Sequence, residues 1–103
     1  MTEQEFRLHA DRAIEGVQRA LLPLADEAGF EVELQNGVLQ VVFDEPSPAK
    51  FVVSPNAPVR QIWVSPMSRS YKLAWSDDTS AFVLDGEPLS ALVERLARQF
   101  VSA

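Results

Sequence analysis

The 103-residue chain has no cysteine and one histidine, and its 15 acidic and nine basic residues give a formal net charge of −6. The lack of thiols excludes disulfides, thiolate-bound zinc or iron–sulfur clusters and a cysteine nucleophile, and one histidine excludes a multi-histidine metal cage. Because 47% of the residues are apolar, we expect a single folded domain over residues 1–103. No apolar run approaches the roughly 18 residues of a membrane span, and the start of the chain lacks the order of a signal peptide. We therefore expect a cytoplasmic protein without a membrane partner, and its negative charge argues against nucleic acid.

The acidic residues are concentrated in the first part of the chain. Residues 1–45 contain ten acidic and three basic residues, whereas residues 46–103 contain five acidic and six basic residues. This asymmetry predicts a polarised surface that attracts cations or basic proteins. A surface of acidic helices that only keeps the protein in solution remains an equally good interpretation.

The first 28 residues have the pattern of a long helix. Thr2 and Glu5 have the spacing of a capping box, in which each side chain bonds to the other residue's backbone amide. Apolar residues at helical spacing follow: Phe6, Ala10, Ala13, Ile14, Val17, Leu21, Leu24 and Ala28. Pro23 removes an amide donor and clashes with the preceding turn, so the helix is predicted to kink or end near Leu22.

Residues 30–43 are predicted to form a β-hairpin around Asn36-Gly37, which is a strong two-residue turn signal. Pairing Gln35 with Val38 places six apolar residues on one face: Phe30, Val32, Leu34, Leu39, Val41 and Phe43. A slip of one residue would destroy this segregation, so the register is well specified. The opposite face is mostly polar, which predicts a sheet that is covered on one side only.

Further strands and a closing helix follow the hairpin. The predicted strands are 50–54, 60–65, 71–75 and 81–84, and the proline-rich stretch 54–58 is assigned to a loop. The helix begins near Pro88, and its apolar stripe consists of Leu89, Leu92, Val93, Leu96 and Phe100. The predicted fold class is therefore α+β, a two-layer sandwich in which two terminal helices pack on one face of a five- to six-stranded antiparallel sheet.

The sequence contains no pattern typical of an active site. There is no Gly-x-Ser-x-Gly motif, and the four glycines are too scattered to form a phosphate-binding loop. His9 lies on the flank of the first helix and is interpreted as a surface residue. We therefore predict no catalytic residues and no enzymatic activity.

Pairs of carboxylates are the candidate metal ligands. Asp11 and Glu15 lie one helical turn apart, and Asp26 lies further along the same side of the helix. Glu31 and Glu33 project from the open strand face, roughly 6–7 Å apart. Oxygen ligands of this kind suit divalent cations that are weakly bound and keep some of their water. A solvated acidic surface explains these acids as well, and more simply.

Trp63 is the candidate anchor for a protein partner. Strand alternation places Trp63 beside Gln61 and Ser65 on the exposed face, where a large aromatic side chain suits a binding hot spot. The alternatives are that a loop covers Trp63 or that its strand is buried on both sides. Trp75 is assigned to the core.

Several motifs together resemble frataxin and its bacterial homologue over nearly the whole chain. They are Glu5-Phe6 with Ala10-Asp11, Asn36-Gly37-Val38-Leu39, Pro58, Gln61-Ile62-Trp63-Val64-Ser65-Pro66, Tyr71, Trp75, and Asp85-Gly86 before Leu89. The central Gln-Ile-Trp strand followed by tyrosine and tryptophan is the most specific of these.

The resemblance implies a helix–sheet–helix sandwich and a role in iron–sulfur cluster assembly. It implies weak binding of iron, as Fe²⁺ or Fe³⁺, and docking on the cysteine desulfurase and the scaffold protein, with modulation of sulfur transfer or iron delivery. The implied metal ligands are Asp11, Glu15, Asp26, Glu27, Glu31 and Glu33. The implied partner-binding residues are Trp63, Gln61 and Arg60.

The chain departs from the family at the end of the first helix, where family members crowd acidic residues. This chain has Gln18, Arg19, Leu22, Pro23 and Ala25 there. Arg19 would repel a cation, which argues against iron storage and ferroxidase-like activity and favours a protein-binding modulator.

We expect a monomer, with iron-dependent oligomers as the alternative. The rival functions are a metal-delivery protein that uses Asp26, Glu27, Glu31 and Glu33, and a small acidic effector or secretion chaperone.

Overall fold

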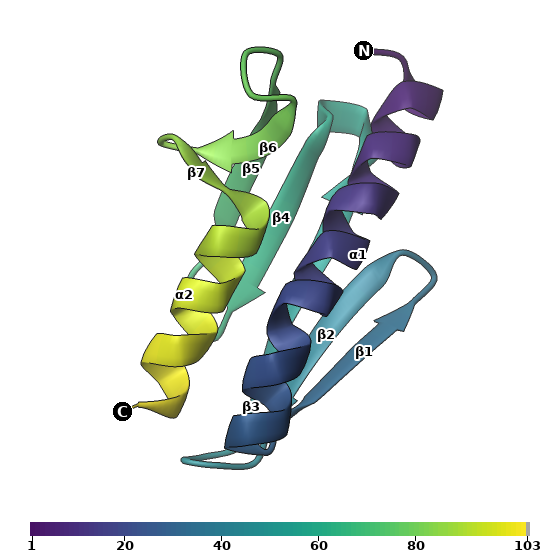
Figure 1. Ribbon diagram of the computed structural model, residues 1–103. Coiled ribbons are helices and arrows are strands. Elements are labelled where there is room, and N and C mark those ends of the chain that lie inside the picture. Colours follow the sequence, from purple (N-terminus) through teal and green to yellow (C-terminus); the bar gives the residue numbers. More distant parts are fainter. Residues whose placement is uncertain (103) are drawn as a thin grey trace.

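The computed structural model describes residues 1–102, in which two helices cover one face of a seven-stranded antiparallel sheet. The elements are α1 (Glu3–Ala28), β1 (Glu31–Gln35), β2 (Val38–Phe43), β3 (Ala49–Asn56), η1 (Ala57–Val59), β4 (Gln61–Pro66), β5 (Tyr71–Ser76), β6 (Ala81–Leu84), β7 (Glu87–Pro88) and α2 (Leu89–Val101). Figure 1 shows α1 and α2 side by side against the sheet, with the two termini at opposite ends. The strands follow one another across the sheet in chain order.

The predicted α+β sandwich is confirmed, but the prediction of five or six strands is wrong. The chain turns at Asp85 and Gly86, both of which have positive φ. Glu87 and Pro88 then pair with Leu84 and Val83 before α2 begins. This two-residue strand is too short to leave an alternation pattern in the sequence.

The capping box at the start of α1 is confirmed. The Thr2 hydroxyl accepts a hydrogen bond from the Glu5 amide at 3.1 Å, and the Glu5 carboxylate accepts one from the Thr2 amide at 3.1 Å. The hydrogen bond from the Thr2 backbone amide to the carboxylate is the main cause that holds the pKa of Glu5 below its ordinary value. Gly29 ends the helix with φ 81°, and its amide donates to the Ala25 carbonyl at 2.8 Å.

Of the two predicted effects of Pro23, a kink or an end near Leu22, the end is wrong, because the helix continues through Pro23 to Ala28. Leu21 and Leu24 are buried on either side of the proline, whereas Pro23 itself is exposed. The packing of this last part of α1 against the sheet offsets the hydrogen bond that the proline removes.

The predicted hairpin and its register are confirmed. Gln35 pairs with Val38, and the turn residues Asn36 and Gly37 have φ angles of 54° and 77°. Both central residues of a type I′ turn need a positive φ, which Asn-Gly adopts readily. The apolar residues of the hairpin face the helices, and the opposite residues face away from them.

The core lies between the helices and the inner face of the sheet. Its largest fully buried side chains include Phe6, Ile14, Leu21, Leu39, Phe43, Ile62, Leu73, Phe82 and Leu92. One boundary differs from the predicted loop 54–58: β3 continues through Pro55, which pairs with Ile62. The fixed φ of proline is compatible with this extended conformation. No helix within residues 1–102 is both long and apolar enough to cross a membrane.

Candidate functional site

The face of the sheet opposite the helices is the candidate site, and we call it the open face. The register of the strands places these residues on it: Glu31, Glu33, Gln35, Val38, Gln40, Val42, Lys50, Val52, Ser54, Gln61, Trp63, Ser65, Lys72 and Ala74. Their neighbours in sequence face α1 and α2 and form the core. The open face therefore combines a rigid backbone with side chains that the helices do not cover.

Trp63 lies near the middle of the open face, between its cross-strand partners Ser54 and Lys72. The indole Nε1 of Trp63 donates a hydrogen bond to Gln61 Oε1 at 3.0 Å. The Lys72 ammonium lies 5.0 Å from the centre of the Trp63 ring, within cation–π range. The predicted placement of Trp63 on the exposed face is confirmed, and two neighbours restrict the motion of its ring.

Lys72 was missed as a candidate site residue in the sequence. The alternation of Tyr71–Ser76 places Lys72 on the outer face, but its contact with Trp63 depends on the register between β4 and β5. The connection of residues 67–70 contains no two-residue turn signal such as Asn-Gly, so the sequence does not fix that register. The candidate anchor for a partner therefore consists of the Trp63 ring together with the Lys72 ammonium.

The rest of the open face has valines on β2 and β3, lysines on β3 and β5, and acidic side chains on the edge strand β1. Val38, Val42 and Val52 are half-buried, whereas Glu31 and Glu33 are exposed on the edge strand β1. The two lysines of the chain, Lys50 and Lys72, both lie on this face, on β3 and β5. A partner on this face would therefore meet an acidic margin at β1 and basic side chains further across the sheet.

Arg60 lies at the end of the open face rather than on it. Its backbone has a left-handed conformation with φ 54°, at the turn between η1 and β4. The guanidinium donates hydrogen bonds to the carbonyl of Ala57 and, at 3.5 Å, to the carbonyl of Met1. Of the three predicted partner-binding residues, only Gln61 and Trp63 are brought together by the structure.

The predicted metal ligands Asp11 and Glu15 face the turn of the hairpin. They line a small cavity of about 200 Å³ together with Leu34 and Gly37. A Cβ atom at Gly37 would lie 3.6 Å from Asp11 Oδ1, which shows how closely this carboxylate approaches the turn. Glu31 and Glu33 point away from the helices on the open face, so the two pairs of carboxylates lie on different faces of the molecule.

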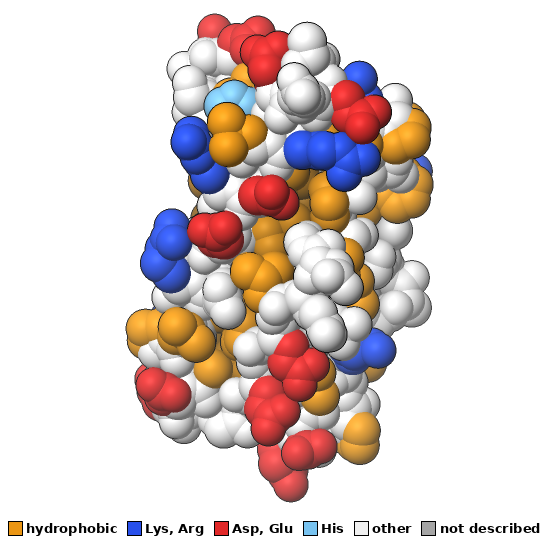
Figure 2. All heavy atoms as spheres, turned by 90° about the vertical axis from the view of Figure 1, so that its right-hand side faces the viewer, with side chains coloured by type: hydrophobic (Ala, Val, Ile, Leu, Met, Phe, Trp, Pro, Cys, Tyr) orange, Lys and Arg blue, Asp and Glu red, His pale blue; other side chains and the backbone are white. Residues whose placement is uncertain are grey.

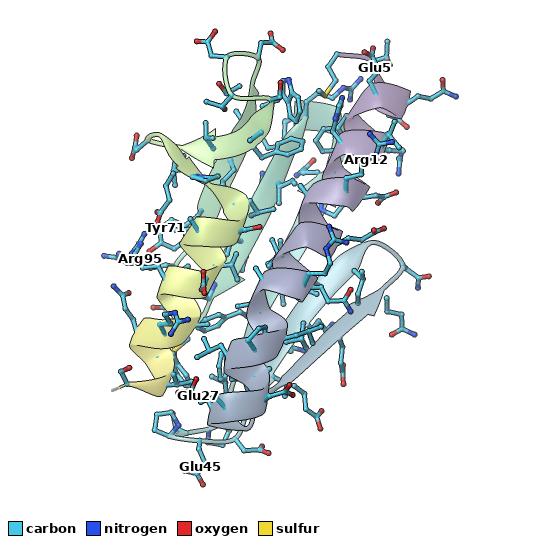
Figure 3. The ribbon with its side chains drawn as sticks, viewed as in Figure 1. Glu5, Arg12, Glu27, Glu45, Tyr71 and Arg95 are labelled. Carbon is cyan, nitrogen blue, oxygen red and sulfur yellow. The ribbon has the colours of Figure 1, made fainter. Side chains whose placement is uncertain are left out.

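Asp26 and Glu27 lie at the C-terminal end of α1. Glu27 lines a cleft of about 580 Å³ with Glu45 and Arg98, and Figure 3 shows Glu27 and Glu45 at the same end of the molecule. The proximity of Glu45, which lies in the loop between β2 and β3, was missed because no sequence pattern places a loop against a helix end. Arg98 also forms an ion pair with Glu94, at 3.1 Å.

The six predicted metal ligands do not form one common site. Within residues 1–102, no three His, Asp or Glu side chains are arranged to hold one metal ion. Figure 2 shows separate groups of acidic side chains on one flank, with basic and uncharged residues between them. A pair of carboxylates could hold a divalent cation only loosely, with water as the remaining ligands. Iron binding by these residues stays a prediction.

The sequence of this chain is similar to those of a known protein family. The family model described as frataxin-like domain matches residues 1–103. The chain belongs to the frataxin-like family. This confirms the resemblance that the motifs around Asn36-Gly37 and Gln61-Ile62-Trp63 indicate.

Two similar proteins carry the name iron-sulfur cluster assembly protein CyaY. The protein of Pseudomonas putida is 30% identical over 100 residues, which cover 93% of this chain and 87% of that protein. The protein of Pseudomonas fluorescens is 29% identical over 107 residues, which cover 100% of this chain and 94% of that protein. Frataxin from Psychromonas ingrahamii, a solved structure, superposes with a TM-score of 0.71 at 17% identity and covers 96% of this chain and 91% of its own. That likeness confirms the frataxin fold.

Proposed function

We propose that this frataxin-like protein acts in iron–sulfur cluster assembly as a binding module without catalytic activity. It docks through the open face on the cysteine desulfurase and the scaffold protein, and it modulates sulfur transfer or iron delivery. Family membership and the similar cluster-assembly proteins support the pathway. The observation that carries the docking site is the position of Trp63, which is held by Gln61 and Lys72 on a face that the helices leave uncovered.

Trp63 supplies the centre of the proposed interface. Large aromatic side chains dominate binding energies when a partner desolvates them, and a ring that is already held in place loses little entropy on binding. The half-buried Val52 lies diagonally across from Trp63 on β3, and Val42 on β2 extends the apolar surface further from it. The charged side chains of this face would steer the encounter, so the association rate should fall as salt is added.

The absence of cysteine in the whole chain fits a modulator of other proteins. An iron–sulfur cluster is commonly held by cysteine thiolates, which this protein cannot supply. If it serves cluster assembly, it must act on proteins that carry the sulfur and the cluster.

Calorimetric titration of the cysteine desulfurase and of the scaffold with Trp63→Ala tests the proposal. We expect at least about tenfold weaker binding to one of them, as for a hot-spot residue. The matched control is Leu8→Ala on α1, which removes a 50% exposed apolar side chain far from the open face and should leave binding unchanged. Equal affinities of wild type and Trp63→Ala for both partners would overturn the docking site.

Iron enters this proposal only as a loosely held cargo. The separated carboxylate pairs predict weak sites that can be removed independently. We expect Asp11→Asn with Glu15→Gln to abolish the Fe²⁺-induced NMR shifts near the hairpin turn and to leave those of β1 intact. Glu31→Gln with Glu33→Gln should do the reverse. Unchanged iron binding in both double variants would exclude these four carboxylates as ligands.

A further inference from the structure

A third hollow lies on the helix side of the sheet, away from the open face. It has a volume of about 450 Å³ and lies between α1, the β5–β6 hairpin and the start of α2. The residues that matter for its chemistry are His9, Arg12, Gly16, Trp75, Phe82 and Ser90. Figure 3 shows Arg12 on the upper half of α1, at the height of β6. This volume lies within the range of small-molecule sites, about 300–1,000 Å³.

One wall of this cavity is a fixed stack of aromatic rings. The centre of the Trp75 ring lies 4.3 Å from that of His9 and 5.2 Å from that of Phe82, which meets it edge-on at 71°. The indole Nε1 of Trp75 donates to Asp77 Oδ1 at 2.9 Å, which fixes the outer edge of the ring. A flat apolar ligand would find this wall already ordered, so its binding would cost little rearrangement.

Small residues of α1 keep the cavity open. Ala13 and Gly16 line it, and a Cβ atom at Gly16 would have Ser90 Oγ as its nearest neighbour, at 3.8 Å. Larger side chains at these positions would occupy the space between the two helices. The hollow therefore follows directly from the sequence of α1.

Arg12 supplies a formal positive charge at the cavity, while the carboxylate of Asp77 lies at its outer edge, bonded to Trp75. Arg12 is exposed at its rim, and no acidic residue lines it. Within the described residues, the ion pairs involve Arg7, Arg95 and Arg98, so Arg12 keeps its donors free. The start of α2 adds to this potential, because its N-cap is Pro88 and its first turn contains no acidic residue.

We propose that this cavity binds a small monocarboxylate with an aromatic or branched apolar body. The body lies against the accessible part of the half-buried Trp75 ring, which Phe82 supports from the core, and the carboxylate accepts hydrogen bonds from the fork of the Arg12 guanidinium, a geometry that suits arginine better than lysine. The site is separate from the open face and does not depend on the proposed docking function.

The probe for this site is 3-phenylpropionate, with the neutral 3-phenylpropionamide as its matched control. In Trp63→Phe, Trp75 is the single remaining tryptophan, so its fluorescence reports on the cavity. We expect a saturable change with a dissociation constant on the order of 1 mM, as suits a ligand of this size in an open cavity. The amide should bind about tenfold more weakly because it lacks the charge-assisted hydrogen bonds to Arg12. NMR of the wild-type protein should show shifts of the Trp75 indole N–H and not of the Trp63 indole N–H.

Arg12→Gln provides the second test, because this exposed side chain can be changed without disturbing the core. It should weaken 3-phenylpropionate about tenfold. The control Arg19→Gln removes an exposed arginine from the same helix outside the cavity and should leave the affinity unchanged. Equal binding of acid and amide, equal binding by Arg12→Gln, shifts centred on Trp63, or no saturable change would each overturn the proposed site.

Discussion

The two tryptophans lie on neighbouring strands and on opposite faces of the same sheet. Each indole N–H is held by a side chain two residues away: Trp63 donates to Gln61 at 3.0 Å, and Trp75 donates to Asp77 at 2.9 Å. The local restraint is therefore nearly the same for both rings. The two rings differ instead in the residues that the fold packs around them.

Trp75 packs against the core and between other rings, whereas Trp63 has a charged neighbour and no helix above it. His9 and Phe82 flank Trp75, while Lys72 lies over Trp63. An ordered aromatic ring therefore has two uses in this fold. Trp75 packs against the core on the covered face, whereas Trp63 is available to a binding partner on the open face.

Truncation of the two tryptophans should give the largest difference in the free energy of unfolding between the two faces. Trp75→Ala removes contacts with the core and should lower the free energy of unfolding by about 2–3 kcal/mol, less than for a fully buried ring. Trp63→Ala should cost less than about 1 kcal/mol because the lost contacts are at the surface. Urea unfolding followed by circular dichroism measures both. Equal losses would mean that the open face also contributes to the core.

Adjacent valines of β2 allow the same comparison with smaller side chains. Val41 is 0% exposed on the covered face, whereas Val42 is half-buried on the open face. We expect Val41→Ala to cost about 2 kcal/mol and Val42→Ala less than about 1 kcal/mol. A larger loss for Val42→Ala in the same urea experiment would contradict the assignment of the two faces.

Lys72→Ala tests whether the cation restrains the Trp63 ring. Loss of the cation over an exposed ring should change the free energy of unfolding by only about 0.5 kcal/mol. It should, however, broaden the NMR signal of the Trp63 indole N–H, because one of its two restraints is gone. Lys72→Arg serves as the control and should preserve the narrow signal. An unchanged signal in Lys72→Ala would show that Gln61 alone fixes the ring.

The smallest effect concerns the edge of the sheet at β7. Arg95 donates two hydrogen bonds to Glu87, at 2.8 and 3.0 Å, and these lower the pKa of Glu87 below its ordinary value of 4.5. Stabilisation by this ion pair is therefore present above pH 4.5 and is lost as the pH falls through the lowered pKa. Thermal melts of Glu87→Gln should show a slightly lower midpoint than wild type at pH 7, and the gap should close towards pH 3. A gap that does not depend on pH would contradict this role.

The sequence predicted most of the fold because local patterns agreed with the tertiary structure. Asn36-Gly37 determined the hairpin and its register, and the apolar stripes identified both helices. The helix does not end near Pro23, because packing around Leu24 outweighed a local helix breaker, and the prediction missed β7, which is too short for a periodic pattern.

The candidate site was predictable only in part. Strand alternation placed Trp63 and Gln61 on the open face, because alternation is a local property. The contact of Lys72 with Trp63 and the stacking of His9 on Trp75 both join distant segments, so they required the structure. His9, interpreted as a surface residue, is half-buried.

We expect the open face to bind the assembly proteins while the helix face maintains the fold. Mapping the amide shifts of the ¹⁵N-labelled protein on addition of unlabelled cysteine desulfurase, and then of scaffold, tests it directly. Shifts and line broadening concentrated at the outward residues of β3, β4 and β5, including the Trp63 indole N–H, are the predicted result. Shifts concentrated on α1 and α2, with the Trp63 signal unchanged, would contradict the account.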